Sequence, residues 1–156
     1  MLNVRVPGLG TLRITHLVLD YNGTLAIDGR PLRGVKTRLK RLARSLRVHV
    51  VTADTFGRAQ AELSDVECEL QILRPGREDR AKARYVRRLG SSRVACVGNG
   101  RNDRSMLRVA RLGVAVVQAE GAAAEALAAA DVIVHSINDA LDLFLHPRRL
   151  IASLRA

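Results

Sequence analysis

Short apolar runs alternate with longer amphipathic stretches along most of the chain. Six runs rich in branched apolar residues predict strands at His16–Tyr21, Val48–Thr52, Leu70–Leu73, Val94–Val97, Val114–Val117 and Val132–His135. The stretches around them predict helices at Leu32–Leu46, Thr55–Val66, Arg77–Leu89, Asp103–Ala110, Gly121–Ala130 and Ala140–Leu154. Crossover helices that pack on both faces of a mostly parallel sheet give this alternation. The sequence therefore predicts an α/β fold.

The first residues follow a different pattern. The segment LNVRVPGLGTLRI at 2–14 predicts two short strands around Pro7-Gly8, forming a β-hairpin beside the main sheet. The chain has 156 residues, 47% of them hydrophobic. At this size roughly 70% of the unfolded surface can be buried, so one core is available. We expect a single domain over residues 1–156.

The strongly basic composition has two interpretations. The formal net charge is +11, and all but Lys36, Lys40 and Lys82 of the 26 basic residues are arginines. Clustered arginines attract phosphate, which favours an acidic partner. Genome composition or a solvated surface gives the same excess, and we favour that interpretation. Aromatic content of 3% without Trp offers little stacking surface, so nucleic acid is a less favoured partner.

Cysteine use and hydropathy limit the cellular setting. Cys68 and Cys96 lie far apart without metal-ligand spacing, which predicts reduced thiols. The longest weakly charged stretch, Leu112 to Ala130, contains glutamates and lacks the roughly 20 unbroken apolar residues of a membrane span. The first residues also lack the pattern of a secretory signal. We expect a cytoplasmic protein with no membrane partner.

Polar residues end several of the predicted strands. The first strand ends in DYNGT at 20–24, the second in TAD at 52–54, and the fourth in GNGRND at 98–103. Lys82 lies near the start of the helix before that fourth strand. Ligands gather beyond the carboxyl ends of the strands in an open parallel sheet. We therefore expect these four segments to meet at one edge.

These residue types suit phosphoryl transfer. Asp20 is the expected nucleophile, because a carboxylate can attack phosphorus and form an acyl phosphate. Asp20, the backbone carbonyl of Asn22 and Asp103 offer the hard oxygen ligands that Mg2+ prefers. Thr52 and Lys82 are expected to stabilise the phosphoryl oxygens. Taken singly, each motif also fits a structural turn or a helix cap; their order and spacing together favour function.

Together the motifs resemble the haloacid dehalogenase superfamily, and within it the phosphorylation domain of P-type ATPases and the soluble prokaryotic proteins like it. The segment at 20–24 resembles the phosphorylation motif, and VTADTFGRA at 51–59 resembles the Thr-Gly-Asp-Asn segment, with Asp54 beside Thr52. The segment at 78–90 resembles the lysine-bearing helix. VACVGNGRNDRSML at 94–107 resembles the Gly-Asp-Gly-x-Asn-Asp loop, and the match continues through 113–134.

The resemblance implies a Rossmann-like hydrolase fold, a phosphorylated substrate and Mg2+ as cofactor. It places catalysis at Asp20, Asn22, Thr52 and Lys82, phosphate binding at Asp20, Gly23, Thr24, Thr52, Ala53, Lys82 and Asn102, and the metal at Asp20, Asn22, Asn99 and Asp103. Only 27 residues separate Thr24 from Thr52 and 29 separate Thr52 from Lys82, so no cap domain fits. An open site admits small or macromolecular substrates, or is closed by a neighbouring subunit in a homo-oligomer.

Two residues depart from the family pattern. Phosphatases of this superfamily usually carry a second aspartate where Asn22 stands, and an amide can neither protonate a leaving group nor activate water. Asn99 replaces an anionic metal ligand by a neutral one, which predicts weaker Mg2+ binding. We therefore expect a slow Mg2+-dependent phosphatase. The alternative is a non-catalytic module that keeps the phosphate pocket and binds an acidic partner or nucleic acid.

Overall fold

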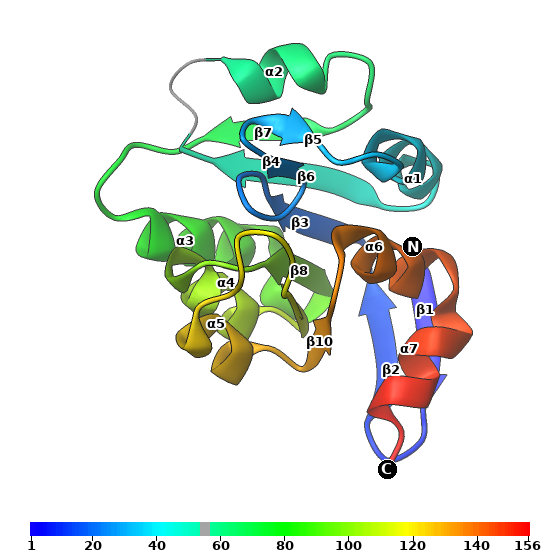
Figure 1. Cartoon of the computed structure of the whole chain (residues 1–156). Coiled ribbons are helices and arrows are strands. Elements are labelled where there is room, and N and C mark those ends of the chain that lie inside the picture. Colours follow the sequence, from blue (N-terminus) through cyan, green and yellow to red (C-terminus); the bar gives the residue numbers. More distant parts are fainter. Residues whose placement is uncertain (54–56) are drawn as a thin grey trace.

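A parallel six-stranded sheet runs through the centre of the computed structural model, which describes residues 1–53 and 57–156 (Figure 1). Its strands, in spatial order, are β10 (Val132–Val134), β9 (Leu112–Val116), β8 (Val94–Gly98), β3 (His16–Asp20), β6 (Arg47–Thr52) and β7 (Glu69–Ile72). Every adjacent pair is parallel. All six predicted strands are present, with ends that differ from the prediction by one or two residues.

Helices cover both faces of this sheet, as predicted (Figure 1). One face carries α1 (Val35–Ala43), α2 (Arg58–Glu62), α6 (Ile137–Leu145) and α7 (Pro147–Leu154). The other carries α3 (Glu78–Leu89), α4 (Arg104–Val109) and α5 (Ala124–Ala129). Short 3-10 turns at Ser91–Arg93 and Arg101–Asp103 flank β8. Central strands covered on both faces bury every residue, which explains the unbroken apolar runs of β8 and β9.

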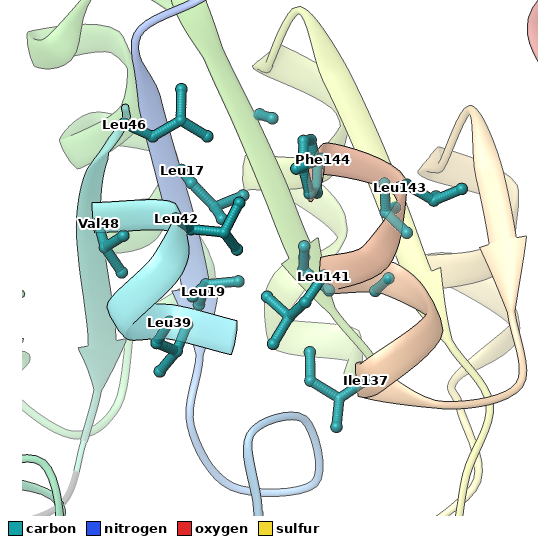
Figure 2. Packing of buried hydrophobic residues seen from close by; sticks show 14 of the residues in the cluster. Leu17, Leu19, Leu39, Leu42, Leu46, Val48, Ile137, Leu141, Leu143 and Phe144 are labelled. Atoms are coloured by element: carbon teal, nitrogen blue, oxygen red, sulfur yellow. The ribbon is translucent and has the colours of Figure 1, made fainter. Parts of the chain in front are cut away.

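The larger part of the core lies between the sheet and the helices α1 and α6. Figure 2 shows Leu39 and Leu42 of α1 pointing toward Leu17 and Leu19 of β3, with Leu141 of α6 beside them. All five side chains are at most 1% exposed. Truncating a leucine in such a position to alanine typically costs about 2–5 kcal/mol. The strand that ends in Asp20 is therefore held firmly from this face.

The predicted N-terminal hairpin is present as a separate two-stranded antiparallel sheet of β1 (Leu2–Val6) and β2 (Gly10–Ile14). Its apolar positions alternate, so that Val4 and Val6 face inward with Leu12 and Ile14. The hairpin packs beside α7, and the amide of Ala156 donates to the carbonyl of Pro7 at 3.2 Å (Figure 1).

Two local features differ from the prediction. A small antiparallel ribbon, β4 (Ala26–Ile27) with β5 (Arg30–Pro31), precedes α1 and was not predicted. Its turn residues Asp28 and Gly29 both have positive φ, of 52° and 78°, as a tight hairpin turn requires. The single helix predicted over 140–154 is wrong: α6 ends at Leu145, and Pro147 starts α7 because proline lacks the amide that a continuous helix needs.

The order of the strands places β3 at the point where the chain changes direction across the sheet. From β3 the chain passes to β6 and β7 on one side, and then crosses to β8 and β9 on the other. Such a switch point leaves a crevice at the carboxyl ends of the strands. Within the described residues, the intervals at 25–51 and 57–81 hold only core elements and the ribbon, so neither interval contains a cap domain. In the same residues, no helix combines the length and apolarity needed to cross a bilayer.

Candidate active site

Asp20 is the last residue of β3 and lies at the switch point between β6 and β8. After it the chain turns back sharply: the amide of Gly23 donates to the carbonyl of Ala26 at 2.8 Å, and the amide of Ala26 donates to the carbonyl of Tyr21 at 2.9 Å. Gly23 has φ of 79°, and a Cβ there would lie 2.7 Å from the Asn99 side chain. Glycine is therefore required at this position.

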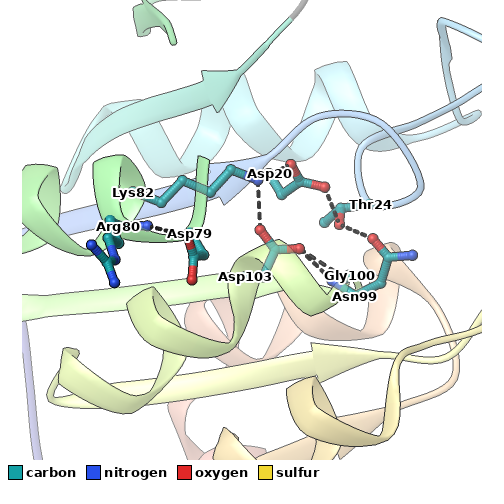
Figure 3. A network of polar contacts seen from close by, with 8 residues as sticks. All are labelled: Asp20, Thr24, Asp79, Arg80, Lys82, Asn99, Gly100 and Asp103. Atoms are coloured by element: carbon teal, nitrogen blue, oxygen red, sulfur yellow. Dashed lines mark hydrogen bonds and ion pairs between the residues drawn. The ribbon is translucent and has the colours of Figure 1, made fainter. Parts of the chain in front are cut away.

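Lys82 of α3 joins Asp20 to Asp103, as Figure 3 shows. Its ammonium donates to Asp20 Oδ1 at 2.7 Å and to Asp103 Oδ1 at 2.6 Å. Lys82 is 1% exposed, Asp20 6% and Asp103 0%. These three predicted site residues, which lie far apart in sequence, therefore form one buried ionic network.

The loop after β8 holds Asp103 rigidly. Asp103 Oδ2 accepts hydrogen bonds from the amides of Asn99 at 3.0 Å and Gly100 at 2.9 Å. A Cβ on Gly98 would lie 2.5 Å from the Asp103 carboxyl carbon, so the loop closes around this carboxylate only with glycine there.

Thr24 connects the first loop to this one. Its hydroxyl lies 3.1 Å from Asp20 Oδ2 and 3.1 Å from Asn99 Oδ1, so its single hydrogen is shared between two acceptors. The side-chain amide of Asn99 in turn donates to the carbonyl of Gly121 at 3.1 Å.

Gln118 also fixes the first loop, and the sequence interpretation missed it. Its amide nitrogen donates to the carbonyls of Gly23 at 3.1 Å and Thr24 at 2.7 Å. Its amide oxygen accepts from the backbone of Ile137, at the start of α6, at 2.9 Å. Gln118 follows the apolar run of β9, so the rule that selected the other strand ends would have found it.

The remaining predicted site residues differ in how deeply they are buried. Thr52 is buried at the end of β6, one residue beyond the partner of Asp20, and Ala53 follows it half-buried. Asn22 and Asn102 are exposed, and in the described part of the chain neither side chain hydrogen-bonds to the Asp20 network. Asp54 lies outside the described residues.

The network holds more negative than positive charge, because one ammonium faces two carboxylates. Burial, and then the charge of Asp103, raise the pKa of Asp20 to about 6, against the opposing effect of Lys82 and Thr24. Burial by itself lowers the pKa of Lys82, but the charges of Asp20 and Asp103 outweigh it and raise that pKa. At neutral pH, Lys82 is therefore charged and Asp20 is mostly ionised.

The oxygen atoms around Asp20 suit a hard cation. Asp20 and Asp103 supply carboxylate oxygens, Asn99 an amide oxygen, and the backbone carbonyl of Asn22 takes no part in the loop hydrogen bonds of the described residues. Such ligands, beside an uncompensated negative charge, match the preference of Mg2+. Among the described residues, no three His, Cys, Asp or Glu side chains gather around one point where they could bind a metal, so any ion here depends on neutral oxygens too.

A second buried polar network lies at the amino end of the sheet. His16 Nδ1 lies 2.9 Å from His49 Nε2, and His49 Nδ1 lies 2.8 Å from the Tyr85 hydroxyl and 3.5 Å from a Glu69 carboxylate oxygen. Burial is the main cause that lowers the pKa of both histidines. His16 lies four residues before Asp20 on β3, which places these two residues about 13 Å apart along the strand.

Three comparisons relate the chain to known proteins. The family model of haloacid dehalogenase-like hydrolases matches residues 84–141, which include Asn99 and Asp103 but neither Asp20 nor Lys82. An uncharacterized protein of Methanocaldococcus jannaschii is 42% identical over 65 residues, covering 42% of this chain and 70% of the relative.

Two solved structures show the same fold. The 3-deoxy-D-manno-octulosonate 8-phosphate phosphatase of Moraxella catarrhalis, solved with magnesium and phosphate ions and KDO, has a TM-score of 0.72 at 16% identity; the match covers 92% of this chain and 95% of that one. The catalytic domain of a CPx-ATPase has a TM-score of 0.60 at 20% identity, over 73% of this chain and 45% of that one.

Proposed function

Since this chain belongs to the haloacid dehalogenase-like hydrolases, we propose that it is a Mg2+-dependent phosphohydrolase that acts through a phosphorylated Asp20. One observation carries the proposal: three segments far apart in sequence bring Asp20 with Thr24, Lys82 and Asp103 into one buried network at the switch point of the sheet. A fixed carboxylate beside an ammonium is the arrangement that nucleophilic attack on a phosphate ester requires.

Asp20 attacks the phosphorus of a phosphomonoester with one carboxylate oxygen. The new bond joins this oxygen to phosphorus while the bond to the ester oxygen breaks, and the alcohol leaves. Lys82 and Thr52 stabilise the negative charge on the phosphoryl oxygens. A water molecule then attacks the phosphorus, releases inorganic phosphate and restores the Asp20 carboxylate. Two displacements replace one difficult step.

Asp20, Asn22, Asn99 and Asp103 would hold the Mg2+ ion. When bound, the ion neutralises charge on the transferring phosphoryl group and on the buried carboxylates. Asn99 contributes no negative charge, which supports binding weaker than in a site with an aspartate there.

Asn22 sets the expected rate. Its exposed side chain follows the nucleophile by two residues, and an amide cannot donate a proton to the leaving alcohol. The leaving oxygen therefore takes its proton from water, and a weakly basic leaving group such as nitrophenolate is favoured over an alkyl alcohol. Dephosphorylation of Asp20 lacks a general base as well, so the acyl phosphate persists.

The test compares Asp20→Asn with the wild type on p-nitrophenyl phosphate, with Mg2+ and with a chelator. Wild-type turnover should require Mg2+, and Asp20→Asn should lower it by roughly 10⁴-fold or more. Asp65→Asn is the matched control, because it removes an exposed carboxylate that pairs, among the described residues, only with Lys36 and Lys40. Retained turnover in a folded Asp20→Asn protein, or equal loss in the control, contradicts the proposal.

A further inference from the structure

A basic groove lies between α3 and the edge strand β7, with a volume of about 730 Å³. Arg74, Arg77, Arg80 and Arg84 line it. Its other lining residues are uncharged, so no carboxylate of the described chain lines the groove itself; Arg77 also borders the adjoining hollow, which contains Glu78 and Asp79. All four arginines are exposed, and none forms an ion pair with a described residue.

Other hollows of the surface differ from this groove in charge. The hollow of about 280 Å³ near the amino ends of β6 and β7 contains Glu67 and Glu69. The hollow of about 630 Å³ beside the β4–β5 ribbon contains Asp28 and Glu62. If the four arginines only reflected the high arginine content of the whole surface, we would expect carboxylates to line the groove as well, as they line these two hollows. The groove therefore departs from the average surface of this protein.

In the adjoining hollow, of about 310 Å³, an arginine is paired with a carboxylate. This hollow shares Gly76 and Arg77 with the groove, but its Arg104 pairs with Asp79 at 3.2 Å. Carboxylates that can neutralise an arginine are thus present near the start of α3, but none of them lines the groove.

Two arginines of the groove, Arg80 and Arg84, lie on one side of α3, about 6 Å apart along the helix axis. Arg77 directly precedes the helix, and Arg74 lies in the segment between β7 and α3. Lys82 lies on the opposite side of the same helix: Figure 3 shows Arg80 pointing away from the Asp20 network. The groove is therefore separate from the candidate active site.

We propose that this groove binds a small ligand that carries two or more phosphate groups. Guanidinium groups form paired hydrogen bonds with phosphate oxygens, and four of them in one groove carry more positive charge than a single phosphate dianion neutralises. The volume lies within the range of small-molecule pockets, about 300–1,000 Å³. The lining has no aromatic residue on which a nucleobase could stack, which favours a compact polyphosphorylated ligand over a nucleic acid strand.

Calorimetric titration of the full chain with tripolyphosphate, in the presence of a chelator, tests this proposal. The double variant Arg80→Gln/Arg84→Gln should bind at least about tenfold more weakly than the wild type. The control Arg5→Gln/Arg13→Gln removes the same charge from exposed positions on the hairpin and should bind as the wild type does. Turnover of p-nitrophenyl phosphate should stay unchanged in both variants, so the groove and the phosphohydrolase proposal are tested separately.

Three results would overturn the proposal. Equal weakening in the hairpin control would mean that net charge alone attracts the anion. Unchanged affinity in the groove variant would exclude these arginines as ligands. Tighter binding of a short DNA duplex than of tripolyphosphate, lost in the groove variant, would show that the groove binds nucleic acid instead.

Discussion

At the carboxyl end of the central sheet two carboxylates share one ammonium, whereas at its amino end two imidazoles and a phenol form a chain of hydrogen bonds. The same elements build both: β3 contributes Asp20 and His16, and α3 contributes Lys82 and Tyr85. Each network is largely buried. The difference lies in charge, since burial lowers the pKa of His16 and His49 and so favours their neutral forms.

The two networks differ in how well their buried groups are satisfied. A buried polar group is inexpensive when its neighbours satisfy it in a neutral form, as at the amino end. A buried charge without a partner lowers stability, and its presence at the carboxyl end indicates that a positively charged ligand binds there. A cation would supply that charge around Asp20, beside the phosphoryl group.

The largest expected contrast comes from removing one α3 side chain from each network. Lys82→Met leaves Asp20 and Asp103 facing each other without a cation, and should lower the free energy of unfolding by about 3–5 kcal/mol without metal. Tyr85→Phe loses one hydrogen bond and should cost only about 1 kcal/mol, with turnover unchanged. Urea unfolding and p-nitrophenyl phosphate turnover measure both. Equal losses of stability would show that the two networks do not differ as described.

Restoring a carboxylate beside the functional network is expected to act on rate. Asn22→Asp supplies the missing proton donor and should raise kcat for an alkyl phosphate by about 10²–10⁴-fold, with a much smaller gain for p-nitrophenyl phosphate. Asn3→Asp on the hairpin adds the same charge at another exposed position and should change neither rate. A uniform gain on both substrates would point to metal affinity and not to proton transfer.

The smallest expected effect is on the pH dependence of stability, through the histidines at the amino end of the sheet. Because the pKa of His49 is lowered in the folded state, the unfolded chain binds more protons below about pH 6.5, and stability should fall as the pH falls through this range. His49→Gln does not titrate, so its Tm should fall less than that of the wild type between pH 7 and pH 5. The charged neighbours Glu69 and Arg47 and the second imidazole of His16 stay in place. His135→Gln, at an exposed position, should follow the wild-type curve.

The sequence alone predicted much of this arrangement, because strand patterns and strand-end polar residues are local signals. The six strands, the hairpin and the segments around Asp20 and Asp103 follow from such signals. The β4–β5 ribbon was not predicted, although its Asp28-Gly29 pair is a hairpin signal, and neither was the break before Pro147. Both features follow from local sequence signals and could have been predicted.

Other features depend on contacts that no local pattern contains. The histidine chain joins His16 to His49, 33 residues away, and His49 to Tyr85, 36 residues away. Parallel pairing of β3 with β6 and the placement of α3 bring these groups together. Likewise, the Asp20–Lys82 pair spans 62 residues, and only the folded chain shows that Lys82 also binds Asp103.

The most direct test of the account is to trap the phosphorylated nucleophile. The wild-type protein is mixed with p-nitrophenyl phosphate and Mg2+, quenched in acid within one turnover, and digested for mass spectrometry. We expect one added phosphoryl group on the peptide that contains Asp20, at a level that the slow second step allows to build up. Turnover of the substrate with Asp20 unmodified, or with the phosphoryl group on another residue, would contradict a mechanism through phosphorylated Asp20.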